Sequence, residues 1–501
     1  MKQITTLDDP REQLAPDQQR YQRMLLLVIM LSVMAFGSLM TIVTVSLDLI
    51  ATDLNSSVST ITWTITGLMV AVAVTTPIGG KLGDLYGNRP MLLIGLAGGV
   101  VTTVLCSLAW DAPSLIAFRV LFGVFGGLVN PNAMSLMIHA YGVERRATAL
   151  GWFNFAMTGS PVIGVVVSGP LIDSQGWRPV FAGFAAVSAL ALVVAWFVAR
   201  PTPTQDDVKL DLLGAATLAL AVLAGLLTIT SFLGSYRTDG WGSAFSNPVA
   251  LGLALLCGVG VRLFIVAERR SEAPLLKLAY FGRRNFTLPM VAAALMQFAY
   301  MGGFVVTPRL LDKGYGWTVG AAALLIAFRP LAFSLASILG GKAPSVLGLR
   351  PPIVMGTLLM IASMVAFTGA SFLTSLNGIG LIAAGLVLSG VASGVSMPSV
   401  AATMVGSVDK SDMGIAVGMN QQMTMIGIVC GIQTMSVLLG DTASATPTRF
   451  ATTYGFGGLI AIGSLACALM IRSQSVNDRA VETTAPDPVP APAPTRAVTT
   501  A

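Results

Sequence analysis

Long apolar runs separated by short polar segments repeat along almost the whole chain. Most runs hold about twenty residues, which lets a helix rising roughly 1.5 Å per residue cross about 30 Å of hydrocarbon. The pattern therefore predicts an all-α polytopic membrane protein with fourteen transmembrane helices. The predicted spans are 24–49, 60–80, 91–110, 113–139, 147–170, 180–199, 211–233, 247–267, 285–308, 317–341, 352–373, 377–402, 414–438 and 454–472.

A segment between two apolar runs near the first quarter of the chain recurs in the second half. Residues 79–95 (GGKLGDLYGNRPMLLIG) and 340–356 (GGKAPSVLGLRPPIVMG) match at a fixed offset of 261. The offset places the second span over the tenth, so we expect two pseudo-symmetric six-helix bundles at 24–199 and 285–472. Residues 200–284 then hold two inserted transmembrane helices with flanking loops. Internal repeats of membrane helices are typical of transporters.

Positive residues concentrate in the loops on one predicted side of the membrane. The double arginines at 145–146, 269–270 and 283–284 lie on the side that also carries both tails. The positive-inside rule places this side in the cytoplasm, so we expect a plasma membrane protein with both termini cytoplasmic. The tails, 1–23 and 473–501, lack apolar periodicity, and the second is rich in proline and expected to be disordered.

Composition excludes several other classes of protein. Hydrophobic residues make up 54% of the 501 residues and charged residues only 10%, against roughly 25% charged in soluble domains. The net charge of +6 arises from loops on one side, so it does not indicate nucleic-acid binding. The four cysteines and His139 lack metal-ligand spacing, so we expect free thiols, no metal and no cofactor. No phosphate-binding loop or dinucleotide fingerprint occurs, and no nucleotide partner is expected.

Several short motifs occur in the order found in one transporter family. The first loop resembles the signature between spans 2 and 3 of the major facilitator superfamily, whose pattern is roughly G-x-L-x-D-x-x-G-R. The residues that carry this likeness are Gly80, Leu82, Asp84, Gly87 and Arg89, with the arginine one position late. Further similarities are residues 41–47 in span 1, Trp63 in span 2, Arg119 with Gly123 in span 4, Gly159, Pro161 and Gly164 in span 5, and Trp177, Arg178 and Phe181 after it. With its fourteen spans, the chain resembles the drug:proton antiporter branch of that superfamily.

The likeness in the repeated loop implies a conformational latch. In this interpretation Asp84 and Arg89 help to hold one arrangement of the two bundles, with Asp84 accepting hydrogen bonds from main-chain N–H groups and from Arg89. Gly80 and Gly87 would let the chain turn tightly between the two helices. The alternative is a simple surface loop with a local ion pair that contributes little. The second copy has Ser345 in place of Asp84, so only the first can supply the charge.

Small residues and a proline in span 5 resemble a motif associated with exporters. Gly159 and Gly164 would let neighbouring helices approach closely, and Pro161 would bend the helix. Ser160 and Val165 stand where the family motif has glycines. Ordinary helix packing explains the same pattern, so both interpretations remain open.

Two arginines fall inside predicted spans, where charges are costly and usually functional. Arg329 lies about 12 residues into span 10, which is roughly 18 Å deep, and Pro330 follows it, so we expect a break or bend there. For Arg329 the alternatives are a cavity-facing or gating charge and a structural ion pair between bundles. Arg119 lies nearer the outer face, where its side chain could reach water. The family resemblance implies that Arg119 takes part in proton-coupled movement.

Acidic residues are missing from the middle of every predicted span. Leu39 occupies the position at which the resembled branch usually carries an acid. Asp48, at the outer end of span 1, is the remaining candidate that could bind and release a proton as an outer vestibule opens and closes. An exposed carboxylate at a helix end is the alternative. Proton coupling is therefore implied by the resemblance alone.

Mid-span polar residues are candidates for a substrate cavity between the bundles. They are Arg329, Gln297, Tyr300, Asn154, Gln421 and Gln422. Amides and a phenol could orient a ligand, although each could equally form hydrogen bonds between helices. A desolvated cation needs a negative partner, and these positions offer none. The sequence therefore favours a neutral or anionic amphipathic substrate.

The function expected from these observations is secondary active export of amphipathic molecules or drugs by alternating access, driven by protons. An uptake symporter and an uncoupled lipid or metabolite exporter on the same fold remain alternatives. A membrane enzyme would need a carboxylate pair, a nucleophile set or a large extramembrane domain, and the sequence offers none of these. We therefore expect no enzymatic activity.

Overall fold

The computed structural model describes residues 16–141, 146–204, 211–271, 278–373, 376–408, 413–440 and 445–472. This part of the chain contains 14 helical spans long and apolar enough to cross a membrane and no strand, so the all-α class and the fourteen predicted spans are confirmed. The helices are α1 (Pro16–Asp53), α2 (Val58–Tyr86), α3 (Asn88–Ser107), α4 (Ala112–Tyr141), α5 (Arg146–Gln175), α6 (Trp177–Val198), α7 (Leu212–Ser246), α8 (Pro248–Arg270), α9 (Arg284–Tyr315), α10 (Val319–Ile326), α11 (Phe328–Leu347), α12 (Arg350–Ala370), α13 (Leu376–Val405), α14 (Met413–Leu439) and α15 (Pro447–Met470), with a 3₁₀ turn at Leu278–Gly282. The predicted tail 473–501 and most of 1–23 lie outside the described residues.

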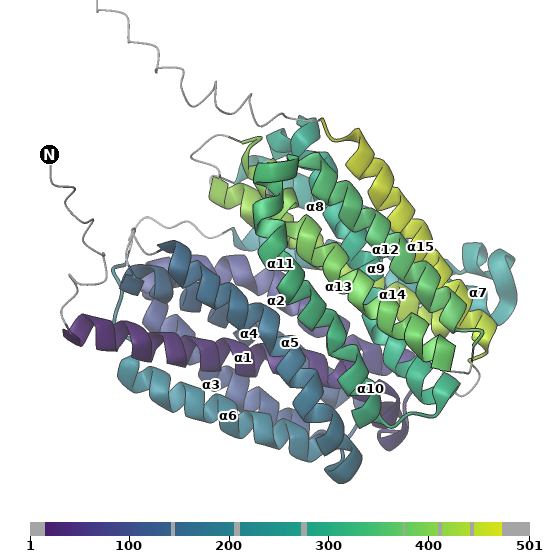
Figure 1. The fold of residues 1–501 in the computed structure, drawn as a ribbon, viewed down its shortest axis with the longest axis horizontal. Helices are drawn as coiled ribbons and strands as arrows, with labels where there is room; N and C mark the ends of the chain where they lie inside the picture. Colours follow the sequence, from purple (N-terminus) through teal and green to yellow (C-terminus); the bar gives the residue numbers. More distant parts are fainter. Residues whose placement is uncertain are drawn as a thin grey trace, which may run out of the picture.

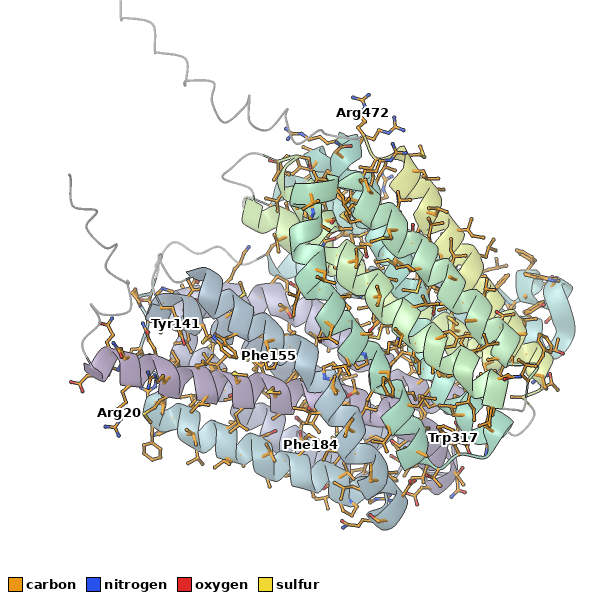
Figure 2. All side chains as sticks on the ribbon, in the orientation of Figure 1. Arg20, Tyr141, Phe155, Phe184, Trp317 and Arg472 are labelled. Carbon is orange, nitrogen blue, oxygen red and sulfur yellow. The ribbon has the colours of Figure 1, made fainter. Side chains whose placement is uncertain are left out.

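The helices fall into two packed sets. The first set consists of α1–α6. In it, α4 packs against α2 and α3, α1 packs on α5, and α6 packs on α3. In the second set, α9–α15, α13 packs against α11 and α12, while α9 packs against α14 and α15. Figure 1 shows the two sets converging where α10 lies and diverging towards the start of α1 and the end of α15. Trp317 marks the convergent end, whereas Arg20, Tyr141 and Arg472 lie at the far ends (Figure 2).

The repeated loop is shorter than the sequence suggests. Helix α2 continues to Tyr86, so Gly80 and Asp84 lie inside the helix, and the expectation that Gly80 forms the turn is wrong. Gly87 alone makes the turn, with φ 95°, and Gly348 does the same in the second copy, with φ 82°. A glycine is needed there because a side chain strains a positive φ.

Span 9 also extends beyond its predicted end. Helix α9 runs through Pro308 to Tyr315 and stops where Gly316 adopts a left-handed conformation with φ 69°. This ending is common because the glycine N–H can reach the last helical carbonyls. Arg309, which the sequence places in a loop, therefore lies inside a helix.

Span 10 is interrupted beside its charge, as predicted. Helix α10 ends at Ile326 and α11 begins at Phe328, immediately before Arg329 and Pro330. Pro330 has no N–H to donate to the carbonyl of Ile326, which weakens the helix at this turn.

Glycines shared by the two copies of the repeat make the same close helix contact in each set. A Cβ on Gly79 would come within 2.4 Å of the Gly127 oxygen, and a Cβ on Gly340 within 2.5 Å of the Gly394 oxygen. The repeat therefore brings α2 against α4 and α11 against α13 in the same way, because small residues let helix backbones touch.

A second repeat, absent from the sequence predictions, supplies the opposite side of these contacts. Gly123, Gly127 and Pro131 of α4 recur as Gly390, Gly394 and Pro398 of α13, at a fixed offset of 267. Gly123 faces the Leu68 oxygen and Gly390 faces the Arg329 oxygen. The six-residue difference from the first offset hides this correspondence in a search at one spacing.

Candidate functional site

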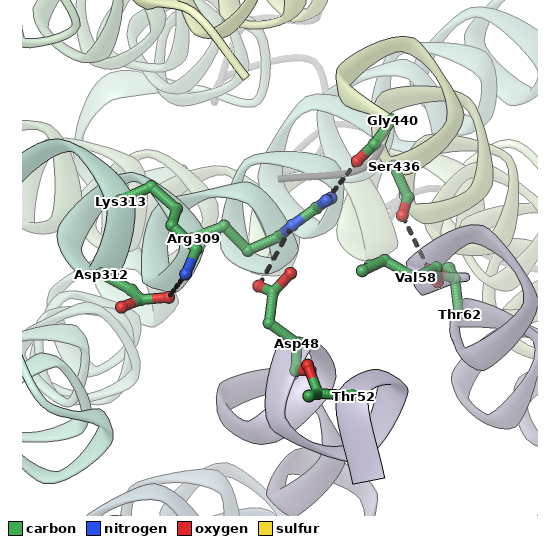
Figure 3. Close-up of polar contacts among 9 residues, drawn as sticks. All are labelled: Asp48, Thr52, Val58, Thr62, Arg309, Asp312, Lys313, Ser436 and Gly440. Atoms are coloured by element: carbon green, nitrogen blue, oxygen red, sulfur yellow. Dashed lines mark hydrogen bonds and ion pairs between the residues drawn. The ribbon is translucent and has the colours of Figure 1, made fainter. Parts of the chain in front are cut away.

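Polar contacts join the two sets at the end where α1, α5 and α9 finish, named here the closed end. An ion pair connects Asp48 of α1 with Arg309 of α9, with 3.4 Å between Oδ2 and Nε (Figure 3). The hydroxyls of Thr62 on α2 and Ser436 on α14 lie 2.7 Å apart. These helices belong to different sets, so any separation of the sets at this end must break both contacts.

Helix α5 makes a further contact with the second set at the closed end. The N–H of Gly320 donates to Oδ2 of Asp173 at 2.7 Å. Gly320 lies in the first turn of α10, whose own cap is Thr318. A carboxylate at this position is stabilised by unpaired N–H groups and by the positive end of the helix. Asp173 therefore links α5 to α10.

The Asp48–Arg309 ion pair is largely shielded from solvent. The side chain of Arg309 is 1% exposed and that of Asp48 is 21% exposed. Arg309 also donates to the main-chain oxygen of Gly440 at the end of α14. Breaking a buried pair on one side leaves an uncompensated charge, which is strongly destabilising. The pair is thus a strong constraint on the closed end.

A pocket of about 340 Å³ opens beside this ion pair. Its polar lining includes Asp48, Asp173 and Arg309, together with Asp312 and Lys313, which pair with each other at 3.2 Å. The pocket thus lies against residues from α1, α5 and α9, where separation of the sets would admit water.

Arg119 of α4 is buried among main-chain oxygens and aromatic rings. Its Nη1 donates to the Leu39 oxygen at 2.9 Å and its Nε to the Thr64 oxygen at 3.3 Å. The guanidinium also lies 5.7 Å and 5.8 Å from the ring centres of Phe122 and Phe181. Leu39, at the position where the family resemblance implies an acid, therefore meets Arg119 through its main-chain oxygen. Nη2 has no hydrogen-bond partner among the described residues.

Arg329 of α11 is fully buried in the second set and does not face lipid. It donates to the Tyr300 oxygen and lies 3.9 Å from the Tyr300 ring centre and 5.6 Å from that of Phe304. Within the described part of the chain, Nε and Nη1 have no hydrogen-bond partner. The structure brings together two predicted cavity residues, Arg329 and Tyr300, but encloses them in protein.

The other predicted cavity residues are dispersed. Gln297 accepts a hydrogen bond from Ser393 at 3.3 Å inside the second set, and Gln421 is exposed. Gln422 of α14 donates to the Ala73 oxygen of α2 at 2.8 Å and so crosses between the sets. The side chain of Asn154 lies outside the described residues.

The Gln422 contact depends on a proline. Pro77 has no N–H, so the Ala73 carbonyl four residues earlier lacks its usual helical partner. Gln422 supplies the missing hydrogen bond from the other set. In α5, Pro161 similarly frees the Met157 oxygen, which accepts from the Ser160 hydroxyl at 3.0 Å.

Residues of the span 5 motif pack on α1. A Cβ on Gly164 would come within 2.6 Å of the Ser38 oxygen, and the Ser160 side chain faces Gly37. Ser38 donates to the Ser160 oxygen at 2.9 Å. Gly159 is not crowded, since the nearest atom to its Cβ position is 3.8 Å away.

The predicted Asp84–Arg89 contact is absent among the described residues. Arg89 instead donates to the Trp196 oxygen at 2.9 Å, at the end of α6. Arg350, its counterpart in the second copy, donates to the Leu469 oxygen at 2.6 Å, at the end of α15. Arg89 is the second residue of α3 and Arg350 the first residue of α12. Each binds the end of the last helix of its own set, so Arg89 is directed to α6 and not to Asp84.

Sequence reasoning missed Arg309 and Gln433. The predicted span 285–308 leaves Arg309 in a loop, although the apolar Leu310 and Leu311 follow it and are buried in α9. Gln433 is fully buried on α14 and touches helices of two other segments. No short motif marks it, because its partners are distant in sequence.

The described residues contain no set of side chains that could bind a metal ion. No group of three or more His, Cys, Asp or Glu side chains lies close enough to hold a metal ion there. Cys106, Cys257, Cys430 and Cys467 are free thiols, and of these only Cys106 is fully buried.

Comparisons with known proteins agree with this fold. The profile of the Major Facilitator Superfamily matches residues 25–428. The Multidrug transporter protein MdtP of Bacillus subtilis is 27% identical, over 83% of this chain and 75% of the relative. The tetracenomycin C resistance and export protein of Streptomyces glaucescens is also 27% identical, over 83% of this chain and 76% of the relative.

A solved structure has the same architecture. The crystal structure of the peptide transporter POT in complex with sulfate superposes with a TM-score of 0.66, covering 90% of this chain and 95% of the transporter. Sequence identity is 16%, so this likeness concerns the fold alone.

Proposed function

We propose that this chain, which belongs to the major facilitator superfamily, is a secondary active exporter of amphipathic small molecules. The observation that carries the proposal is the pair of similarly packed helix sets joined at one end by breakable polar contacts. Such an arrangement supports alternating access, in which the sets rock about a central site. The relative named for tetracenomycin C resistance and export supports the outward direction of transport.

The proposed moving bodies are residues 24–199 and 285–472. The positive loops favour a cytoplasmic location for both termini. With that orientation the closed end faces outward, and the Asp48–Arg309 pair seals the outer side. The described conformation then corresponds to a transporter that opens towards the cytoplasm.

The proposed substrate is neutral or anionic. The buried charged side chains of the described residues are three arginines and two acids. The arginines, Arg119, Arg309 and Arg329, all lie in the two six-helix sets, whereas Asp211 and Glu268 lie at the ends of α7 and α8. Away from the closed end, where Asp48 pairs with Arg309, a desolvated cation would meet Arg119 and Arg329 without a buried acid beside them.

Protons are the proposed coupling ion, and Asp48 is the proposed carrier. A proton on Asp48 would remove the negative partner of Arg309 and weaken the closed end. The pair can reform only after Asp48 loses this proton, so protonation of Asp48 and closure of this end exclude each other. Asp84 and Arg89 retain a proposed role at the opposite end, acting in another conformation.

Transport in inverted vesicles with an imposed proton gradient tests this function. We expect gradient-driven accumulation of anionic or neutral amphipathic dyes, and loss of the response in Asp48→Asn. Asp53→Asn is the matched control, because Asp53 pairs with Arg178 inside the first set and is 43% exposed. Equal loss in both variants would remove Asp48 from the coupling step, and absence of transport would contradict the exporter proposal.

Arg329→Ala tests the proposed substrate charge in the same assay. We expect it to reduce accumulation of anionic dyes at least tenfold relative to neutral dyes. Strong transport of cationic dyes that persists in Arg329→Ala would overturn the proposed preference.

A further inference from the structure

The two helices inserted between the six-helix sets have no counterpart in the internal repeat. Helix α7 nevertheless contacts both sets, packing against α2 of the first and α14 of the second. It therefore covers the seam between α2 and α14. Its partner α8 is mostly exposed and packs chiefly on α7.

One buried side chain connects all three helices at this seam. Gln433 of α14 is fully buried. Its Oε1 accepts from the Thr66 hydroxyl of α2 at 3.3 Å, and its Nε2 donates to the Thr230 hydroxyl of α7 at 2.8 Å. A buried amide that loses its hydrogen-bond partners destabilises the protein, so Gln433 favours the arrangement in which the three helices meet.

The Thr66–Gln433 contact lies on the same helix faces as the Thr62–Ser436 contact of the closed end. Ser436 follows Gln433 by three residues on α14, and Thr62 precedes Thr66 by four residues on α2. These spacings put each pair on one helix face. The Thr62–Ser436 and Thr66–Gln433 contacts therefore form a single polar row between the sets, which α7 joins through Thr230.

Apolar packing ties α7 and α8 to the second set. Leu218 of α7 and Phe264 of α8 share one buried cluster with Phe286, Met290 and Met419 of the second set. The separate buried cluster at the start of α1 contains residues of the first set only. Separation of the sets would leave intact the cluster that Leu218 and Phe264 share with the second set.

We propose that α7 and α8 move with the second set and close the α2–α14 seam, with Gln433 as the positioning residue. When the closed end opens, Gln433 loses Thr66 and keeps Thr230. The inserted pair then acts as a third component of the gate. This inference rests on the proposed alternating-access function.

Spin-label distances in lipid vesicles test the proposal. Labels at Ser59 of α2, Ser231 of α7 and Leu438 of α14 report on the three helices, and Arg309→Ala serves to open the closed end. We expect the Ser59–Ser231 distance to lengthen on opening, while the Ser231–Leu438 distance stays constant. Lengthening of the second distance with a constant first one would overturn the proposal, because α7 would then follow the first set.

Two threonines of α7 provide a matched pair of variants. Thr228 and Thr230 each donate to the carbonyl four residues earlier at 2.8 Å, but only Thr230 accepts from Gln433. Thr230→Val should broaden the Ser231–Leu438 distance and lower the maximal transport rate severalfold with little change in KM, whereas Thr228→Val should match the unmodified protein. Identical distances in the two variants would contradict the role of Gln433. The spin-label distances are measured without any substrate. A failure to transport dyes would therefore contradict the exporter function and leave the proposed movement of α7 to be judged from the distances.

Discussion

Buried arginines in this protein are surrounded by carbonyl oxygens and aromatic rings more than by carboxylates. Arg119 donates to the main-chain oxygens of Leu39 and Thr64. Arg329 donates to the main-chain oxygen of Tyr300 and lies against the Tyr300 ring. Among the described residues, Arg309 is the one buried arginine with a carboxylate within ion-pair distance. The sequence identified Arg119 and Arg329 from their depth in apolar runs, but their partners come from other helices and leave no local pattern.

Leu39 provides a test of the Arg119 environment. Leu39→Asp should be tolerated better than Leu39→Lys, because the Arg119 guanidinium lies 2.9 Å from the Leu39 main-chain oxygen and favours a negative charge nearby. Leu39→Lys should fail, because a buried charge without a partner costs about 3–5 kcal/mol. Thermal unfolding in detergent and yield in the membrane measure the difference, and equal losses in both variants would argue against a pairing site.

Arg309 should control the closed end. Arg309→Ala removes the partner of Asp48 and the donor to Gly440, so it should lower stability by about 3 kcal/mol and expose Ser436→Cys to an impermeant maleimide. Lys313→Ala, whose side chain is 44% exposed, is the control and should change neither property. Unchanged labelling in Arg309→Ala would show that the pair does not seal this end.

At the scale of helices, glycine and proline determine how the elements meet. Gly79 and Gly340 place α2 and α11 against α4 and α13, and Gly87 forms the turn into α3. Pro77 opens a carbonyl to Gln422 of the other set. The repeat therefore encodes packing in both halves, whereas the charge of Asp84 is confined to one.

Adjacent glycines give a direct comparison at this scale. Gly340→Ala should destabilise the protein by about 1–3 kcal/mol, because overpacking forces the helices apart. Gly341→Ala should be close to neutral, since no atom lies within 4 Å of its Cβ position. The same contrast is expected between Gly79 and Gly80, whose nearest neighbour is 3.6 Å away. Thermal unfolding checks this, and equal effects within each pair would refute the packing explanation.

At the scale of the whole molecule, the two sets and the inserted helices behave as parts of one gate. The closed end joins α1 to α9, α2 to α14 and α5 to α10. The far ends of the helices diverge in Figure 1. Movement between conformations therefore requires loss of a small number of polar contacts at one end.

A reversible cross-link tests this requirement. Thr62 and Ser436 have hydroxyls 2.7 Å apart, so paired cysteines there can approach the ~2.05 Å sulfur separation of a disulfide. Oxidised Thr62→Cys/Ser436→Cys should lose transport, and reduction should restore it, while each single variant remains active. Full activity of the oxidised pair would exclude opening at this end.

The sequence by itself determined the membrane class, the number of spans and the family, because apolar run length, loop charge and short motifs are local properties. It also located the helix interruption at Pro330, since a missing N–H acts on its own helix. Only the tertiary structure decided that Arg309 pairs with Asp48, that Arg89 binds Trp196 instead of Asp84, and that Gln433 joins three helices. These contacts join residues from different helices, and their geometry depends on how the helices pack.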